Sequence, residues 1–199
     1  MTNDTGPNQE ISHAVVIGTS AGGVDALPRL LAALPASFRW PILLVIHLER
    51  TRESRLAESL DRRCAIRVKE ADNMEEIRPG TVYLAPRNYH LLVEDTLHLA
   101  LAGDEPVSFS RPSVDVLFAS AADVFQRNLI GVILTGANAD GAQGLQTVKA
   151  MGGTTIVQTP AEAKFSAMPE AALKTGAVDH VLPLTEIGPL LVRLQAKQG

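Results

Sequence analysis

Three side chains that could together form a nucleophilic site each follow an apolar stretch of this sequence. Ser20 lies in the glycine-rich run 18–23, His47 ends the second apolar stretch, and Asp140 lies in a short turn after a third. A serine hydroxyl is a weak nucleophile until a base takes its proton. Histidine does this near neutral pH, and an aspartate fixes the histidine tautomer and stabilises the imidazolium. These residue types therefore predict attack on a carbonyl carbon.

Position along the predicted strands supports this grouping. Three short apolar runs predict buried strands, namely 13–18, 41–47 and 129–134. In open parallel sheets, binding sites form outside the carboxyl ends of the strands. If the three strands are neighbours, the three side chains meet at one edge. The glycine-rich turn would expose Ser20, and the backbone N–H of Ala21 could stabilise a developing oxyanion.

The order of the three residues excludes one common fold. Residues 18–22 match the G-x-S-x-G pattern of the α/β-hydrolases. In that fold the partners follow the serine in the order Asp, then His. Here the order is Ser20, His47, Asp140. We therefore exclude the α/β-hydrolase fold and keep the triad, because triads recur on unrelated frameworks.

Each of the three residues also has a structural interpretation. A glycine-rich turn between strand and helix is commonly a phosphate cradle, but residues 18–23 lack both the G-x-G-x-x-G spacing and a P-loop lysine. A histidine at a strand end is commonly a hydrogen-bonded structural residue, and an aspartate before glycine is commonly a turn former. Joint placement at three strand ends favours the catalytic interpretation over these alternatives.

The remaining patterns alternate between strand and helix, which predicts a parallel α/β sheet. Further strands are expected at 81–85, 90–93, 97–101 and 154–158, and helices at 24–34, 52–60, 113–125, 141–151, 166–174 and 184–197. The pair 90–101 turns at 94–96 and predicts a hairpin that makes the sheet mixed. We predict a flexible tail at 1–11 and one α/β domain at 12–199. Its sheet is expected to be mostly parallel and doubly wound, Rossmann-like and three-layered, with an inserted antiparallel hairpin.

Composition narrows the class of protein. The 199 residues carry a formal net charge of −4 without a basic block, which argues against nucleic-acid binding. The single cysteine, Cys64, excludes an intrachain disulfide. The first ten residues lack an apolar signal core, and the apolar runs are too short to cross a bilayer. We predict a cytoplasmic protein with no membrane insertion.

Several motifs in matching order resemble one family. The region from His13 to Leu191 resembles the catalytic domain of the chemotaxis protein-glutamate methylesterases of the CheB type. The segments that carry the resemblance are 16–23 (VIGTSAGG), 44–47 (LVIH), 82–86 (VYLAP), 90–93 (HLLV), 111–118 (RPSVDVLF), 134–136 with 140–145, and 165–179. Their combination is far more specific than any one motif.

The resemblance implies a Ser-His-Asp triad at Ser20, His47 and Asp140. It implies hydrolysis of glutamate γ-methyl esters on the cytoplasmic helices of chemoreceptors, related deamidation of glutamine, and no metal or organic cofactor. The residues expected to form the oxyanion hole or to bind substrate are Ala21, Gly22, Gly23, Ala137, Arg111 and Met168. For Ser113 we favour a helix cap and for Met168 a packing role, and Arg111 could equally make a structural hydrogen bond or orient a carbonyl or carboxylate.

The sequence departs from the family pattern at several places. Ala21 stands where threonine is common, and residues 137–139 differ from the usual turn that contains methionine and glycine. Family members often carry an N-terminal receiver domain, which the residues before His13 are too few to form. We therefore expect activity without that switch or control by a separate regulatory protein. Three alternatives stay open: an esterase with another substrate, a non-catalytic binding module, and a phosphate or nucleotide binder.

Overall fold

A seven-stranded parallel sheet forms the centre of the molecule. The computed structural model describes residues 11–48, 55–107 and 109–198. Strand order is β3-β4-β2-β1-β7-β8-β9, and every neighbouring pair is parallel. The strands of this sheet are β1 Ala14–Thr19, β2 Ile42–Ile46, β3 Arg67–Glu70, β4 Thr81–Leu84, β7 Leu129–Ile133, β8 Thr154–Gln158 and β9 His180–Leu182. The predicted α/β fold with a mostly parallel sheet is confirmed.

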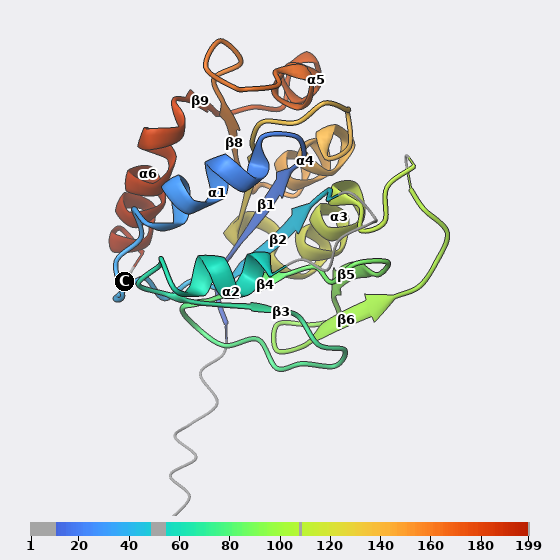
Figure 1. Ribbon diagram of the computed structural model, residues 1–199, viewed down its shortest axis with the longest axis vertical. Coiled ribbons are helices and arrows are strands. Elements are labelled where there is room, and N and C mark those ends of the chain that lie inside the picture. Colours follow the sequence, from blue (N-terminus) through green and yellow to red (C-terminus); the bar gives the residue numbers. More distant parts are fainter. Residues whose placement is uncertain (1–10, 49–54, 108, 199) are drawn as a thin grey trace, which may run out of the picture.

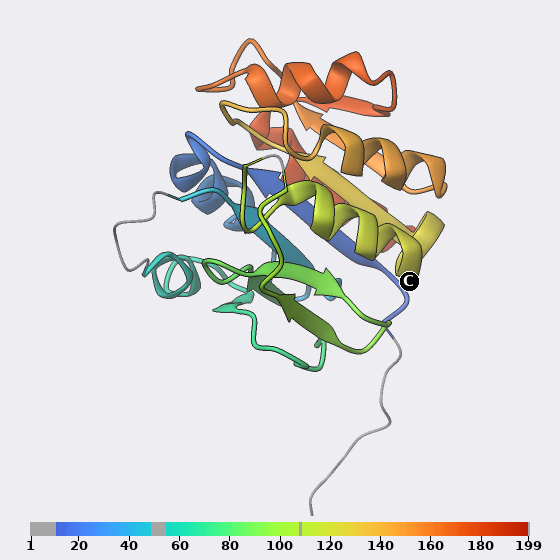
Figure 2. The same ribbon diagram turned by 90° about the vertical axis from the view of Figure 1, so that its right-hand side faces the viewer.

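Helices cover both faces of this sheet and make three layers (Figure 1). They are α1 Gly23–Leu31, α2 Leu56–Asp61, α3 Val114–Phe125, α4 Ala142–Ala150, α5 Ala167–Lys174 and α6 Leu184–Ala196, with a 3-10 turn at Gln126–Asn128. In Figure 2, α3, α4 and α5 lie side by side across one face. The predicted helix 52–60 begins only at Leu56, and residues 52–54 of that prediction lie outside the described residues.

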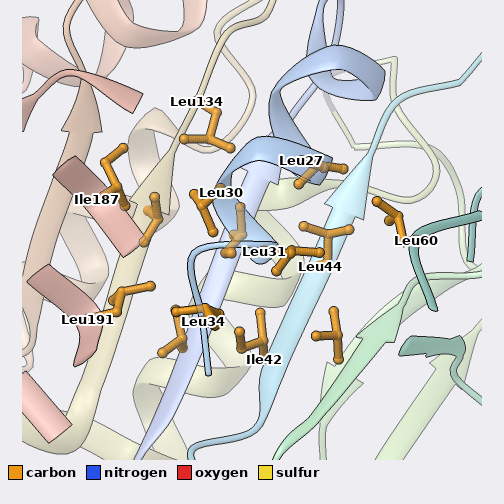
Figure 3. Packing of buried hydrophobic residues seen from close by; sticks show 14 of the residues in the cluster. Leu27, Leu30, Leu31, Leu34, Ile42, Leu44, Leu60, Leu134, Ile187 and Leu191 are labelled. Carbon is orange, nitrogen blue, oxygen red and sulfur yellow. The ribbon is translucent and has the colours of Figure 1, made fainter. Parts of the chain in front are cut away.

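Two apolar clusters fill the spaces between the layers, because successive strand side chains point to opposite faces. In β1, Val15 and Ile17 pack with α1 and α6, whereas Val16 packs with α3 and α4. Figure 3 shows the first cluster, in which Leu30 and Leu31 of α1 lie over the central strands with residues of α6 beside them. Both faces of the central strands are buried, which explains why these strands read as continuous apolar runs.

The predicted hairpin exists as β5 His90–Val93 and β6 Leu99–Ala102, which pair antiparallel. It forms a separate two-stranded sheet, so the expectation that it makes the central sheet mixed is wrong. The hairpin packs beneath α3 instead, where the Val93 N–H donates to Ser120 Oγ at 3.2 Å. Its buried apolar residues cover the same face of the central sheet that α3 and α4 cover.

The start of the described chain is integrated into the fold. Residues 1–10 of the predicted tail 1–11 lie outside the described residues, whereas Ile11 is buried in the second cluster. Across the described ranges, no helix has both the length and the apolar character needed to cross a membrane.

The central strands also place the candidate residues. Strand register pairs Thr19 of β1 with Ile46 of β2, so Ser20 and His47 are the next residues on adjacent strands. On the other side, β1 pairs with β7, and Gly18 lies opposite Ile133. The strand order reverses at β1, because β2 lies on one side of β1 and β7 lies on the other. Open α/β sheets form their binding sites at such a switch point.

Candidate active site

Ser20 lies on a tight turn between β1 and α1. Its N–H donates to the Thr135 carbonyl at 3.1 Å, and its own carbonyl accepts from the Gly23 N–H at 2.9 Å. Gly22 has φ +85°, a left-handed conformation that favours glycine, and a Cβ there would lie 2.8 Å from Thr135 Oγ1. Ser20 itself is not among the described residues with positive φ. The turn thus lacks the strained nucleophile of the α/β-hydrolase elbow.

Thr135, two residues after the end of β7, joins this turn to the end of β7 and to the loop before α5. Its carbonyl accepts from Thr19 Oγ1 at 2.8 Å, and its own hydroxyl lies 2.9 Å from the Ala21 carbonyl. The same hydroxyl accepts from the Phe165 N–H at 2.9 Å. The ends of β1 and β7 and the loop before α5 are therefore held together around Ser20. Thr135 was not among the residues predicted for the site.

Met168 lies against the floor of the Ser20 turn. It is buried, and its N–H donates to the Gly136 carbonyl at 3.0 Å. A Cβ on Gly136 would lie 1.9 Å from Met168 Sδ and 3.0 Å from Ser20 Cβ. Residue 136 must therefore be glycine for the sulfur to pack beside Ser20.

His47 follows β2 and has a partner at each ring nitrogen. Its Nε2 lies 2.9 Å from Asp140 Oδ2, and its Nδ1 lies 3.0 Å from Asn138 Nδ2. Its backbone N–H donates to the Thr19 carbonyl at 3.2 Å. Register makes Ser20 its neighbour, but within the described residues no hydrogen bond joins the Ser20 hydroxyl to the imidazole. The contact to Asn138 was not predicted, although the unusual turn 137–139 was its visible signal.

Asp140 is buried at the N-terminus of α3. Both carboxylate oxygens are used: Oδ1 accepts from Ser113 Oγ and the Asp115 N–H, and Oδ2 accepts from the Val114 N–H and His47. Burial by itself raises the pKa of the Asp140 carboxyl. The hydrogen bonds from His47 and from the start of α3 outweigh burial and leave its pKa below the ordinary value. Asp140 is therefore an anion that can orient the imidazole and stabilise its charge.

The predicted role of Ser113 as a helix cap is confirmed, and its side chain also contacts Asp140. It is the N-cap residue of α3, with its hydroxyl 3.5 Å from the Val116 N–H, and the same hydroxyl donates to Asp140 Oδ1 at 2.9 Å. Its backbone N–H donates to Nδ1 of the buried His90 at 3.2 Å. The contact between this cap and Asp140 was not predicted.

Backbone N–H groups that could stabilise an oxyanion belong to the Ser20 turn and to the turn after β7. Across residues 11–48, 55–107 and 109–198, no hydrogen-bond acceptor faces the N–H of Ala21, Gly22 or Ala137. These three groups can therefore receive an oxyanion. The N–H of Gly23, also a candidate, is already donated to the Ser20 carbonyl.

A cavity of about 540 Å³ opens beside His47. Its wall includes Glu70, Arg87, Phe109 and Arg111 as well as His47, whereas Ser20 is not part of the lining. Arg111 Nη1 donates to the carbonyls of residues 103 and 104, both at 2.9 Å, so this side chain also fastens the loop that borders the cavity. In the part of the chain that the structure describes, no three His, Cys, Asp or Glu side chains gather closely enough to hold a metal ion.

Known proteins with a similar sequence or structure belong to one family of methylesterases. The CheB methylesterase family model matches residues 15–191. A putative protein-glutamate methylesterase/protein-glutamine glutaminase from Leptospira interrogans is 47% identical over 182 residues, which are 92% of this chain and 94% of that relative. Protein-glutamate methylesterase/protein-glutamine glutaminase 5 from Anaeromyxobacter dehalogenans is 42% identical over 94% of this chain, which spans only 52% of that relative.

A solved structure shows the same fold. The crystal structure of the Thermotoga maritima CheB methylesterase catalytic domain superposes with a TM-score of 0.88 and 35% sequence identity, covering 92% of this chain and 98% of that one. Sequence and structure thus agree over nearly the same region that carries the motifs. The chain belongs to the CheB methylesterase family.

Proposed function

We propose that this chain is a serine esterase that hydrolyses γ-methyl esters of glutamate side chains in proteins. The observation that carries the proposal is the buried Asp140 carboxylate 2.9 Å from His47 Nε2, with His47 beside Ser20 in the strand register. Membership of the CheB methylesterase family and the names of its relatives support the same bond as the target.

The acylation step follows from the roles of these groups. Ser20 Oγ bonds to the ester carbonyl carbon while its proton passes to His47 Nδ1, and Asp140 stabilises the resulting imidazolium through Nε2. The negative oxygen of the tetrahedral intermediate accepts from the N–H groups of Ala21 and Ala137. The carbon–oxygen bond to the methoxy group then breaks, and Nδ1 returns its proton so that methanol leaves.

Deacylation repeats the chemistry with water as the nucleophile. His47 takes a proton from water, hydroxide adds to the acyl carbon, and the bond to Ser20 Oγ breaks with return of the proton to the serine. The product is an ionised glutamate. With glutamine in place of the methyl ester, ammonia leaves instead of methanol, as the second half of the relatives' names indicates for those proteins.

We also propose a substrate, a cellular location and a regulatory partner. The substrate that we propose is a methylated helix in the cytoplasmic region of a chemoreceptor, so that the enzyme works in the cytoplasm. The cavity beside His47, bordered by Arg111 and the exposed Phe109, supports a large substrate rather than a small ester. We propose in addition that a separate regulatory protein controls the enzyme.

The test is methanol release from receptor membranes carrying labelled methyl groups. Ser20→Ala is expected to abolish release above background, because no other hydroxyl takes its place in the turn, while thermal unfolding stays close to that of the wild type. Val24→Ala, an exposed change on the following helix, serves as the control that keeps activity. Full methanol release by Ser20→Ala would overturn the proposal. Cleavage of a generic ester without action on methylated receptors would replace the proposed substrate.

A further inference from the structure

The side chain of Asn138 bonds to the His47 ring nitrogen that must act as the base in the proposed reaction. His47 presents Nε2 to Asp140, so only Nδ1 is available as the base for Ser20. That nitrogen is 3.0 Å from Asn138 Nδ2. The inference drawn from this contact rests on the proposed function, since it concerns the same serine and histidine.

The hydrogen bonds of Asn138 decide which end of its amide faces the imidazole. Asn138 Oδ1 accepts from the Asp140 N–H at 3.2 Å, which directs Nδ2 toward His47. An amide NH₂ group only donates, so Nδ1 must offer a lone pair. The ring proton therefore lies on Nε2, where it is donated to the carboxylate of Asp140. Asn138 and Asp140 thus select the same tautomer from opposite sides of the ring.

This tautomer can act as the base for Ser20, but the lone pair on Nδ1 already accepts a hydrogen bond from Asn138. Ser20 Oγ–H and Asn138 Nδ2–H compete for this single acceptor, and in the structure the asparagine bonds to it. Once Nδ1 gains a proton, it faces the donor NH₂ of Asn138, and two donors cannot bond each other. The amide must then turn or withdraw. Its neighbours Ala137 and Ala139 are exposed, so the turn has room to move.

We propose that Asn138 is a positioning residue that keeps Nδ1 of His47 from Ser20 until substrate displaces the amide. Asp140 alone suffices to retain the tautomer, because its hydrogen bond is charge-assisted and the asparagine contact is between neutral groups. Removing the Asn138 amide therefore frees the base without losing its orientation. The free enzyme then becomes more reactive toward small reagents.

The experiment measures the second-order rate of labelling by a fluorophosphonate, followed by mass spectrometry of the Ser20 peptide. In this reaction Ser20 Oγ bonds to phosphorus, fluoride leaves, and the serine proton passes to His47 Nδ1. Asn138→Ala is expected to label about 10-fold faster than the wild type, in line with loss of one competing hydrogen bond. Ala139→Gly, which loosens the same turn without touching His47, is expected to label at the wild-type rate.

A spectroscopic readout separates positioning from a merely structural role. Nitrogen-15 NMR of the wild type is expected to show the proton on Nε2 and a bare Nδ1. Asn138→Asp, which puts an acceptor against Nδ1, is expected to draw a proton to that nitrogen. An unchanged or slower labelling rate in Asn138→Ala, or a wild-type spectrum with the proton on Nδ1, would overturn the inference.

The two proposals fail in different ways. Neither labelling nor NMR needs an ester substrate, so absent methanol release with faster labelling of Asn138→Ala counts against the proposed substrate only. Absence of Ser20 labelling in both wild type and Asn138→Ala overturns the inference about Asn138. The wild-type spectrum also keeps the inference testable if a variant does not fold.

Discussion

Two carboxylates at the edge of the sheet that carries Ser20 occupy equivalent places but differ in chemistry: Asp140 is buried and Asp115 is half-buried. Asp140 precedes α4 and accepts hydrogen bonds from the start of α3, whereas Asp115 lies in the first turn of α3 and accepts from the start of α4. Each helix thus has its N-terminal N–H groups satisfied by the other's aspartate, an arrangement that the positive end of a helix favours. The exchange fixes α3 and α4 against each other at the edge where Ser20 lies.

The two carboxylates differ in how they use their oxygens. Asp140 accepts on both, and one of its four donors is the imidazole of His47. Asp115 accepts the N–H groups of Gly141 and Gly144 on Oδ1 alone, at 2.9 and 2.7 Å. Burial raises the pKa of Asp115, the N–H of Gly144 opposes this, and the charge of Asp140 raises the pKa further. The pKa of Asp140 is lowered instead, because it has more donors and a histidine partner. The different hydrogen-bond partners therefore yield one stabilised anion beside His47 and one carboxyl that holds two helices together.

The largest expected effect is that of Asp140→Asn. An amide has one acceptor oxygen, so its NH₂ group must face donors that the carboxylate accepted. We expect the rate of ester hydrolysis to fall about 10⁴-fold, because the imidazole loses the anion that fixes its tautomer. We also expect the free energy of unfolding to fall by about 3 kcal/mol, because buried donors that bonded to the carboxylate lose their acceptor. Steady-state methanol release and urea denaturation measure the two effects. A variant with half the wild-type rate would remove Asp140 from the proposed triad.

A smaller effect is expected for Ser113→Ala. Its hydroxyl caps α3 and donates to Asp140 Oδ1, so the change removes a cap and one bond to the carboxylate. We expect a loss of about 2 kcal/mol in the free energy of unfolding. Because Asp140 keeps its bond to His47, hydrolysis should slow by only about 10-fold.

Two variants test whether this effect passes through Asp140. Ser113→Thr keeps the hydroxyl and should restore most of the activity. Ser120→Ala, on the same helix, removes a hydroxyl that bonds to Val93 and Leu117 but not to Asp140, and should leave the rate unchanged. Equal slowing of Ser113→Ala and Ser120→Ala would show that the helix as a whole, rather than the contact to Asp140, sets the rate.

Much of the fold could be predicted because the central strands are buried on both faces. The apolar runs that became β1, β2 and β7 stand out in the sequence, and their glycine and polar ends mark the site. The edge strands β3 and β9 were missed. β3 is Arg-Val-Lys-Glu, with both ends exposed, and β9 has only three residues. Edge strands bury too little surface to leave a continuous apolar signal.

The candidate site could be predicted less completely than the fold. Strand ends placed Ser20, His47 and Asp140 at one edge, since register follows from neighbouring strands. The reciprocal contacts of Asp115 and the bond from Ser113 to Asp140 depend on how α3 packs against α4. No spacing in the sequence encodes that packing, because 25 residues separate Asp115 from Asp140. The Asn138 contact depends on the conformation of one turn.

The smallest effect on the rate at neutral pH, and the sharpest test of the comparison, is expected for Asp115→Asn. Both N–H groups bond to the same oxygen of Asp115, and an amide oxygen can accept both. Methanol release should therefore stay within about twofold of the wild type. Asp115→Ala removes the acceptor, leaves two helix N–H groups unsatisfied, and should lower the free energy of unfolding by about 2 kcal/mol.

The pH dependence of Asp115→Asn has a defined sign. The pKa of Asp115 is raised in the folded protein, so its contribution to stability is fully present below the unfolded value of about 3.9 and is lost as pH rises through the folded pKa. An amide does not titrate, so the variant escapes this loss. The free energy of unfolding of Asp115→Asn should therefore rise relative to wild type as pH increases from about 4, then level off. Urea denaturation of both proteins from pH 4 to pH 8 measures the difference. A difference that moves toward the wild type with rising pH would mean that Asp115, like Asp140, is held as a stabilised anion, and the contrast between the two carboxylates would be lost.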